Sequence, residues 1–293
     1  MSGDPYEAGM LIAGELKALD GPKVNPLCRT RLYTHSRSTE QVLLLLHGFT
    51  NCPQQFDALG RQFHDRGWNV LIPRYPRHGY ADRLNTTISE LRSDQLIALA
   101  NQSANAAAGL GKHLTVAGLS LGGVLTGHLA QTHDKVERAV LIAPMFGLKR
   151  IPGPAHSALT RLAYALPNFY LWWDGRLKEQ LGPPHAYPRL ATHAYAALFK
   201  TASGVLKAAG AGAPKAPEIT VITNASEPGL ENRFTHQLVE AWRRRGASVR
   251  TFEFPASDRL PHDMIDPANP DQNIELVYPV VAHAIAGEIR GED

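Results

Sequence analysis

A serine flanked by glycines occurs at residues 118–122, where the sequence reads GLSLG. A serine hydroxyl can act as a nucleophile when a tight strand-to-helix turn exposes it, and glycines two residues away on either side remove side chains that would crowd that turn. The preceding residues 113–118 predict a strand and residues 121–132 an apolar helix. We therefore expect Ser120 to be a nucleophile. The alternative is a glycine-rich turn whose serine only caps the helix.

The segment HGFT at residues 47–50 adds a second feature of the same chemistry. It follows the apolar run QVLLLL at residues 41–46, which predicts a buried strand. When a serine attacks a carbonyl, the oxygen becomes negative and needs two backbone N–H donors. One comes from the loop after this kind of strand and one from the residue after the nucleophile. We expect these donors to be the amides of Phe49 and Leu121, and we expect His47 to orient the loop without transferring a proton.

The base that activates such a serine is a histidine, and the chain has 13 histidines. In one class of parallel-sheet enzymes with such a serine turn, the order expected along the chain is serine, acid, histidine, with the histidine in the loop after the last strand. His262 follows the predicted strand at residues 248–254, whereas His236 and His283 fall inside predicted helices. The sequence therefore predicts His262 as the base.

The acid that orients this histidine should follow the predicted strand at residues 218–223. Glu227 is the one carboxylate in the loop before the next predicted helix. A glutamate can fix the imidazole tautomer and stabilise the imidazolium as an aspartate does. Asp258 is the main rival, Asp263 is adjacent to the histidine in a position where a side chain usually points away, and Asp174 is a more distant candidate.

Short apolar runs alternate with stretches of helical periodicity along most of the chain, as is typical of a parallel sheet covered by helices. The predicted strands are residues 41–46, 68–72, 113–118, 138–143, 218–223 and 248–254. The predicted helices are residues 53–66, 86–108, 121–132, 231–245 and 272–289. The sequence therefore predicts the α/β class, with a mostly parallel central sheet and helices on both faces.

The rhythm changes between residues 145 and 217, where prolines, glycines and aromatic residues crowd together around short pieces of helical character. We interpret residues 145–217 as a helical insertion between two parts of a core, residues 1–144 and 218–293. Trp172 and Trp173 either line an apolar pocket there or pack the insertion onto the core.

Charge and cysteine content exclude several classes of protein. The net charge of +3 over 293 residues is small, and the densest basic run, residues 243–245, is at the end of a predicted helix, so no nucleic-acid partner is expected. Cys28 and Cys52 are expected to be two ordinary thiols, and a single disulfide between them is the alternative. No stretch is long and apolar enough for a membrane span, and the first residues lack the pattern of a secretion signal, so a cytoplasmic protein is expected.

With these residues in place, the chain resembles the α/β-hydrolase superfamily from about residue 41 to residue 289. The resemblance is to carboxylesterases and monoacylglycerol-lipase-like enzymes with a helical cap, in which an HGF-type loop, G-x-S-x-G-G and a late His-Asp pair occur together. Here these are residues 47–49, residues 118–123 and His262-Asp263. The acid of that group is typically Asp, whereas the matching position here is Glu227.

The resemblance implies a cap at residues 145–217 and hydrolysis of a carboxylic ester, a small-molecule substrate, through an acyl-enzyme on Ser120. It implies neither a metal nor an organic cofactor, and the sequence shows no metal-ligand spacing or glycine-rich phosphate loop. A proline-type aminopeptidase, a carbon–carbon bond hydrolase and an acyltransferase share the triad and remain open. A non-catalytic ligand-binding relative is a further alternative. The oligomeric state is not predicted.

Overall fold

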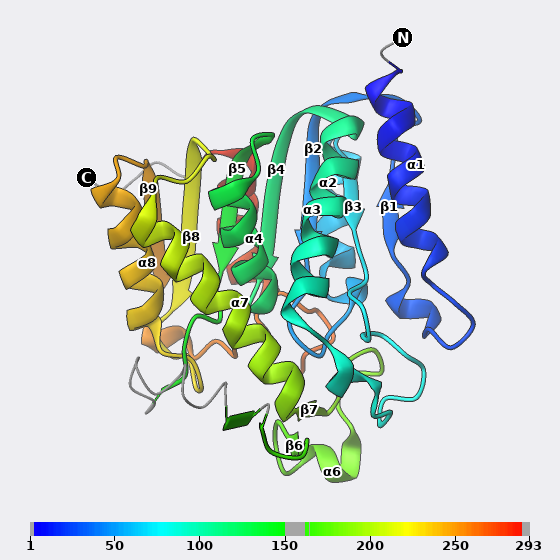
Figure 1. Cartoon of the computed structure of the whole chain (residues 1–293), viewed down its shortest axis with the longest axis vertical. Coiled ribbons are helices and arrows are strands. Elements are labelled where there is room, and N and C mark those ends of the chain that lie inside the picture. Colours follow the sequence, from blue (N-terminus) through cyan, green and yellow to red (C-terminus); the bar gives the residue numbers. More distant parts are fainter. Residues whose placement is uncertain (1–2, 150–161, 164, 289–293) are drawn as a thin grey trace.

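A seven-stranded sheet runs through the centre of the molecule in the computed structural model, which describes residues 3–149, 162–163 and 165–288 (Figure 1). The order across the sheet is β1 (Arg31–Tyr33), β3 (Asn69–Ile72), β2 (Thr39–Leu46), β4 (Gly111–Leu119), β5 (Val136–Ile142), β8 (Glu218–Asn224) and β9 (Val249–Phe254). Only β1 is antiparallel to its neighbour, and the other strands are parallel. The predicted mostly parallel sheet is confirmed.

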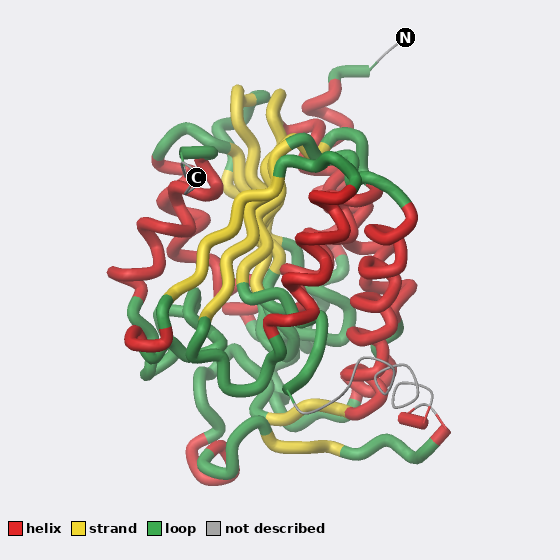
Figure 2. The backbone as a smooth tube through the Cα atoms, turned by 90° about the vertical axis from the view of Figure 1, so that its left-hand side faces the viewer, coloured by secondary structure: helices red, strands yellow, loops and turns green. Residues whose placement is uncertain are grey.

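Helices cover both faces of the sheet, as Figure 2 shows from the side. One face packs on α2 (Asp57–Asp65) and α9 (Ile274–Ala286). The opposite face carries α1 (Pro5–Ala18), α3 (Ser93–Leu110), α4 (Leu121–Thr132), α7 (Thr192–Ala211) and α8 (Asn232–Arg244). The described residues also form four 3-10 turns: η1 (Pro26–Cys28), η2 (Pro53–Phe56), η3 (Thr87–Glu90) and η4 (Ala256–Asp258).

Strand β2 explains why the central strands read as unbroken apolar runs. Side chains alternate across a strand, so Val42 and Leu44 belong to the core under one face, and Leu43 and Leu45 to the core under the other. All four are fully buried. A strand covered on both faces therefore needs apolar residues at every position, which is the pattern that predicted it.

The structure differs from the sequence prediction in three elements. Helix α1 and strand β1 were not predicted, and residues 86–108 do not form one helix. Instead η3 is followed by an extended residue, Arg92 (φ −123°, ψ 152°), and α3 begins at Ser93. The side chain of Gln95 accepts a hydrogen bond from the Arg92 N–H and caps the new helix start, which ends the first segment as a separate turn.

The segment predicted as an insertion is only partly helical. It contains an antiparallel pair, β6 (Tyr170–Trp172) and β7 (Arg189–Ala191), with the short helix α6 (Leu177–Gln180) between them, and then α7. Helix α7 packs against α3, α4 and α8. Residues 150–161 and residue 164 of the segment lie outside the described residues, and the division at residues 145 and 217 stays a prediction.

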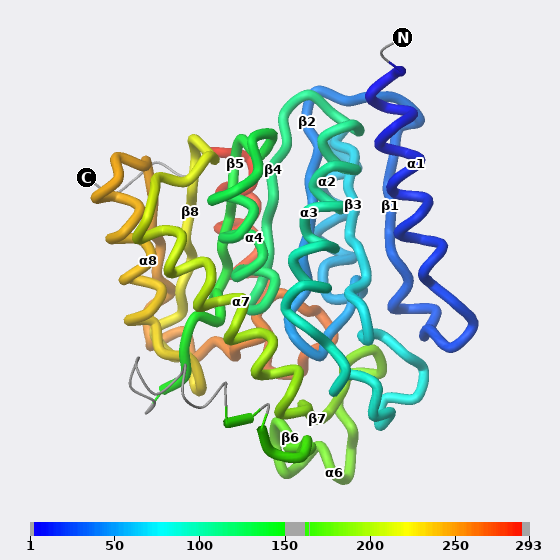
Figure 3. Tube along the Cα trace, in the orientation of Figure 1, coloured from blue at the N-terminus to red at the C-terminus, as the bar shows by residue number. Residues whose placement is uncertain are grey.

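The loops at the carboxyl ends of the parallel strands meet at one edge of the sheet, next to β6, β7 and α6 (Figure 1). Figure 3 follows the chain from β9 beneath this edge before it enters α9 behind the sheet. Within the described part of the chain, no helix combines the length and the apolar character that crossing a bilayer requires.

Candidate active site

Ser120 occupies a strained turn between β4 and α4. Its φ of 59° and ψ of −112° lie in a region that non-glycine residues rarely adopt. The turn is held by its own backbone, because the Ser120 N–H donates to the Ile142 carbonyl (3.0 Å) and the Ser120 carbonyl accepts from Val124 (3.0 Å) and Met145 (3.2 Å). The structure thus places Ser120 in the conformation that the glycine spacing predicted.

The glycines of the motif are required by close backbone contacts. A Cβ atom on Gly118 would lie 2.4 Å from the Gly122 carbonyl, and one on Gly122 would lie 1.8 Å from the Leu46 carbonyl oxygen. Both distances are far below any real carbon contact. Larger residues would therefore force α4 away from the ends of β2 and β4.

His262 is hydrogen-bonded to Glu227, the candidate acid. Its Nδ1–H donates to Glu227 Oε2 over 2.8 Å. The Glu227 side chain is buried, and Oε1 also accepts from the amides of Gly229 (3.3 Å) and Leu230 (3.5 Å). This bond leaves Nε2 as the imidazole nitrogen that can accept a proton, and Nε2 has no hydrogen-bond partner among the described residues.

The interaction between His262 and Glu227 shifts the pKa values of both residues. Burial alone lowers the pKa of His262, but the charge and hydrogen bond of Glu227, together with the charge of Asp263, raise it above the ordinary value for histidine. Burial alone raises the pKa of Glu227, but His262 and the two backbone amides lower it below the usual range. The electrostatics thus favour a glutamate carboxylate beside an imidazole that is readily protonated.

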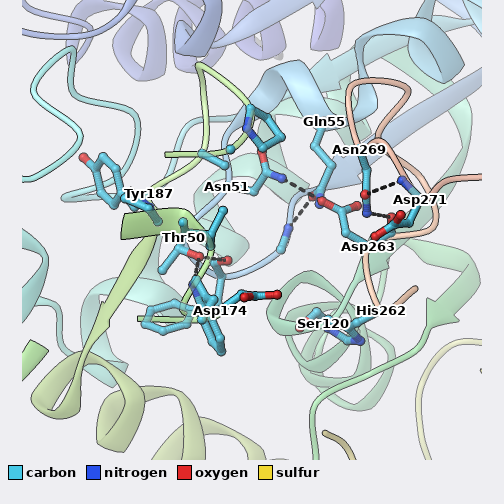
Figure 4. A pocket seen from close by; sticks show the side chains of 18 of the residues that line it. Thr50, Asn51, Gln55, Ser120, Asp174, Tyr187, His262, Asp263, Asn269 and Asp271 are labelled. Atoms are coloured by element: carbon cyan, nitrogen blue, oxygen red, sulfur yellow. Dashed lines mark hydrogen bonds between the residues drawn. The ribbon is translucent and has the colours of Figure 1, made fainter. Parts of the chain in front are cut away.

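Ser120 and His262 line the same pocket, and Figure 4 shows both side chains in the same part of it. Their Oγ and Nε2 atoms are not hydrogen-bonded to each other within the described residues. Such bonds are often long in triads before substrate binds, so this spacing is compatible with a nucleophile and its base.

The rival acids have other partners. Asp258 accepts from the Ser257 hydroxyl (3.4 Å), and Asp174 forms an ion pair with Arg176 (2.7 Å). Asp263 points away from the imidazole and accepts a 3.0 Å hydrogen bond from the Asn51 amide. Glu227 is thus the carboxylate that the structure brings to His262 Nδ1.

The loop after β2 lies directly over the serine. A Cβ on Gly48 would be 3.7 Å from the Ser120 Cβ, so this loop reaches the hydroxyl within one side-chain width. The Gly48 N–H donates to Gln55 Oε1 (2.7 Å), and the Phe49 N–H donates to no other described residue. Leu121 is the first residue of α4, where N–H groups have no partner inside the helix. Within the described part of the chain, neither predicted oxyanion N–H has a hydrogen-bond partner; Phe49 lines the pocket, and Leu121 directly follows Ser120, which also lines it.

His47 is placed as the sequence analysis expected, with both nitrogens occupied by the backbone. Its Nδ1 hydrogen-bonds the Gly48 carbonyl (2.9 Å), and its Nε2 accepts from Tyr75 N–H (3.4 Å). Burial lowers the pKa of His47 well below the ordinary value, and burial lowers the pKa of His78 to about 4. These two neutral rings pack the loop and are not candidates for proton transfer.

The pocket has a volume of about 530 Å³, and its lining combines apolar side chains with charged ones such as Asp174 and Arg176. Residues of the predicted cap supply an apolar wall that includes Trp173, Leu177 and Tyr187. Trp173 Nε1–H donates to Thr50 Oγ1 (2.8 Å) and the Tyr187 N–H donates to the Thr50 carbonyl (2.8 Å), so the wall is fastened to the loop after β2. Trp173 thus both lines the pocket and holds the two segments together.

Cys28 and Cys52 form a disulfide, which corrects the expectation of two free thiols. They are 24 residues apart, but η1 and η2 pack together and bring their Cα atoms to 5.2 Å, within the range of a bridge. The contact between the two turns is non-local, so the spacing of two cysteines could not reveal it.

Sequence reasoning missed a set of buried polar residues behind the pocket. His185 of the predicted cap pairs with Asp266 over 2.6 Å, with both side chains nearly inaccessible. Asn51 joins the loop after β2 to Asp263 through a hydrogen bond, and Gln55 lies beside that carboxylate. Each residue is one of many polar residues in a loop, and only the fold brings them together. Across the described ranges, no group of three or more His, Cys, Asp or Glu side chains is arranged to hold a metal.

A sequence model of the alpha/beta hydrolase family matches residues 43–272. The thermostable monoacylglycerol lipase of Bacillus sp. (strain H-257) is 31% identical over 96 residues, which are 32% of this chain and 36% of that protein. The chain thus aligns with only about a third of the length of this curated relative.

Solved structures share the fold at low sequence identity. One belongs to the work on LipS and LipT, two metagenome-derived lipolytic enzymes, and matches with a TM-score of 0.68 at 18% identity over 90% of this chain and 99% of that one. The monoacylglycerol lipase of Paleococcus ferrophilus matches with a TM-score of 0.64 at 15% identity over 88% and 98%. The family match spans most of the sequence and the architecture agrees with it, so the chain belongs to the alpha/beta hydrolase family.

Proposed function

We propose that this protein is a serine hydrolase that cleaves carboxylic esters, with Ser120, His262 and Glu227 as its catalytic triad. The observation that carries the proposal is the 2.8 Å bond between His262 Nδ1 and the buried Glu227 carboxylate, on an imidazole that shares a pocket with Ser120. Such a chain of acid, base and hydroxyl is the arrangement that activates a serine for acyl transfer.

In the proposed reaction, Ser120 Oγ attacks the acyl carbon while His262 Nε2 takes its proton. The carbonyl oxygen becomes an oxyanion and accepts hydrogen bonds from the Phe49 and Leu121 amides. His262 then protonates the leaving alcohol, and the acyl group stays on Ser120. A water molecule deprotonated by His262 attacks this acyl-enzyme and releases the acid.

The pocket supports short or medium acyl esters, including monoacylglycerol-like ones, as substrates. Its apolar wall suits an alkyl chain, and a volume of about 530 Å³ is in the range of sites for small ligands. Two of the relatives are named as monoacylglycerol lipases, which agrees with this substrate class. We further propose that residues 145–217 act as the cap, because Trp173 and Tyr187 cover the pocket from that segment.

The direct test is Ser120→Ala measured with p-nitrophenyl esters of increasing chain length. We expect the variant to lose hydrolysis and to keep the melting temperature of the wild type. Ser257→Ala is the matched control, because Ser257 is an exposed serine on η4 away from the pocket. Turnover by Ser120→Ala at the rate of the control would refute the assignment.

Substrate panels separate the rival reactions, which use the same triad. Faster cleavage of peptides with an N-terminal proline would indicate an aminopeptidase, and faster cleavage of a carbon–carbon bond next to a ketone would indicate a carbon–carbon bond hydrolase. Faster transfer of the acyl group to an added alcohol than to water would indicate an acyltransferase. A protein that only binds ligands would turn over none of them.

The cytoplasmic location also stays a proposal. Disulfides persist mainly in oxidising compartments, so the Cys28–Cys52 bridge argues against a cytoplasmic location. Thiol labelling of protein taken directly from cells would test the location, because a cytoplasmic pool is expected to be reduced.

A further inference from the structure

Asp263 directly follows the candidate base His262 in the sequence, but its carboxylate is hydrogen-bonded to the loop after β2. Asn51 Nδ2 donates to Asp263 Oδ2 over 3.0 Å. The side chain of Gln55 lies beside the same carboxylate, where it lowers the pKa of Asp263. Gln55 also accepts from the Gly48 N–H over 2.7 Å. Figure 4 shows Asn51 and Gln55 beside Asp263 at the pocket. The hydrogen bond from Asn51 thus joins the loop that carries Phe49 to the loop that carries His262, and Gln55 lies alongside it.

The groups around this carboxylate are themselves fixed. Asn51 accepts from the Cys52 N–H (2.8 Å), which orients its amide, and Cys52 is anchored by the disulfide. The other Asp263 oxygen accepts from the Asp266 N–H (3.3 Å), and Asn269 donates to the Asp263 carbonyl (2.7 Å). Asp263 is therefore hydrogen-bonded both to the loop after β2 and to its own loop.

The carboxylate is kept in this position against an electrostatic cost. Burial, and then the charge of Asp266, raise the pKa of Asp263 to about 6. A neutral side chain would avoid this cost, and residues that oppose stability in this way are concentrated at functional sites.

We propose that Asp263 is a positioning residue of the reaction, whose carboxylate fixes the Phe49 N–H relative to His262. This inference rests on the proposed ester hydrolysis and adds a residue that the triad does not include. Asp263 acts through Asn51 and its neighbour His262 and does not itself meet the substrate's reacting atoms. Its negative charge also favours the imidazolium that forms when Ser120 is deprotonated.

Few titratable groups lie near His262 and Asp263, so the effect of the Asp263 charge can be distinguished in a pH profile. Glu227 and Asp263 are the carboxylates that act on His262, and Asp266 faces Asp263 while paired with His185. Three further groups lie close. Tyr195 faces Glu227 and Tyr278 faces both aspartates, and burial raises the pKa of each phenol so that both stay neutral; Lys149 donates to the Glu227 carbonyl.

The test is Asp263→Asn, followed through kcat, KM and the pH profile of kcat/KM with p-nitrophenyl butyrate. An Asn presents one acceptor where the carboxylate presents two, so one of its donors loses its partner. We expect kcat to fall about ten- to hundred-fold, because small displacements of catalytic groups cost this much, and KM to stay near the wild-type value. We also expect the acidic limb of the profile to move to lower pH, because a negative charge beside His262 is lost.

The Asn51→Ala variant removes the same hydrogen bond between Asn51 and Asp263 by changing the residue in the loop after β2. It should lower kcat similarly while leaving the acidic limb in place, because the Asp263 charge remains. The double variant should be little slower than the worse single variant, since both changes break one link. Asp258→Asn is the matched control and should behave as wild type, because the Asp258 carboxylate accepts from Ser257 alone among the described residues and Asp258 does not line the pocket.

The possible results are distinguishable. An Asp263→Asn variant with unchanged kcat, or with lowered kcat and an unmoved acidic limb, overturns the proposal. If Asp263→Asn does not fold, additive losses in Asn51→Ala combined with Asp263→Glu, a variant that keeps the charge, overturn it as well. A wild-type protein without any ester turnover would instead refute the proposed function and would be seen before any variant is made.

Discussion

Replacing Glu227 by Gln tests the orienting acid with almost no change in size. In the wild type, Oε2 accepts from His262 Nδ1–H while Oε1 accepts from the Gly229 and Leu230 amides. Gln has one oxygen and one NH₂ group for these three donors. Either the NH₂ group faces the two backbone N–H groups, or it faces His262 and selects the tautomer with the proton on Nε2, which cannot accept from Ser120.

The size of the effect follows from these contacts. Exchange of an orienting carboxylate for its amide in a serine–histidine–acid triad lowers kcat by about 10,000-fold, so we expect about 1,000- to 10,000-fold for Glu227→Gln. This corresponds to about 4–5.5 kcal/mol in the activation barrier. The residual activity should also have its acidic limb at lower pH, because burial lowers the pKa of His262 once the Glu227 charge is removed.

The assay is the pH profile of p-nitrophenyl butyrate hydrolysis together with thermal unfolding. Glu240→Gln is the matched control, because Glu240 is an exposed glutamate on α8 with only a loose 3.9 Å ion pair to Arg244. A loss below ten-fold in Glu227→Gln would refute the reasoning. A large loss in Asp258→Asn with little loss in Glu227→Gln would transfer the role of the acid to Asp258.

The remaining predictions concern pH dependence and stability. In the wild type, the acidic limb of kcat/KM should lie above pH 6.5, because the pKa of His262 is raised and the protonated ring cannot act as a base; a limb below pH 6 would contradict this. The folded-state pKa of Asp263 is raised, so its neutral form provides stability that is complete below its unfolded-state pKa and is lost as pH rises through about 6. The free energy of unfolding of Asp263→Asn, measured relative to wild type, should therefore rise between pH 4.5 and pH 8 by at most about 3 kcal/mol. Denaturant titrations of both proteins at the two pH values measure this change. Gly122→Ala should cost about 3 kcal/mol or prevent folding, because its Cβ would lie 1.8 Å from a carbonyl oxygen, whereas Gly14→Ala meets nothing within 4 Å and should not lower the melting temperature. Replacing Cys28 and Cys52 by Ser should cost about 3 kcal/mol for a closed loop of this length, and equal stability of the double variant and wild type under non-reducing conditions would show that the bridge does not form.

The parts of the fold that the sequence predicted are those with local causes. Ser120 lies in a turn whose conformation depends on glycines within two residues. The strands before and after it end in the apolar runs 116–119 and 139–142. His262 and Glu227 were inferred from chain order, since the carboxyl ends of neighbouring parallel strands, here β8 and β9, must share one edge of the sheet.

The parts that escaped prediction depend on contacts between distant segments. Helix α1 is held by close packing on α3, where a Cβ on Gly9 would lie 2.7 Å from the Ala106 carbonyl oxygen. The pairs Cys28–Cys52 and His185–Asp266 join segments that are 24 and 81 residues apart. Periodicity describes one segment at a time and carries no information about which loops meet.

The most direct measurement of the central claim is mass spectrometry after treatment with a serine-reactive fluorophosphonate. An activated Ser120 should carry a single adduct on the peptide that contains it, and labelling should become at least about 100-fold slower in His262→Ala, because a serine without its base is a poor nucleophile. An adduct on another residue, no adduct at all, or equal labelling of His262→Ala and wild type would contradict the account.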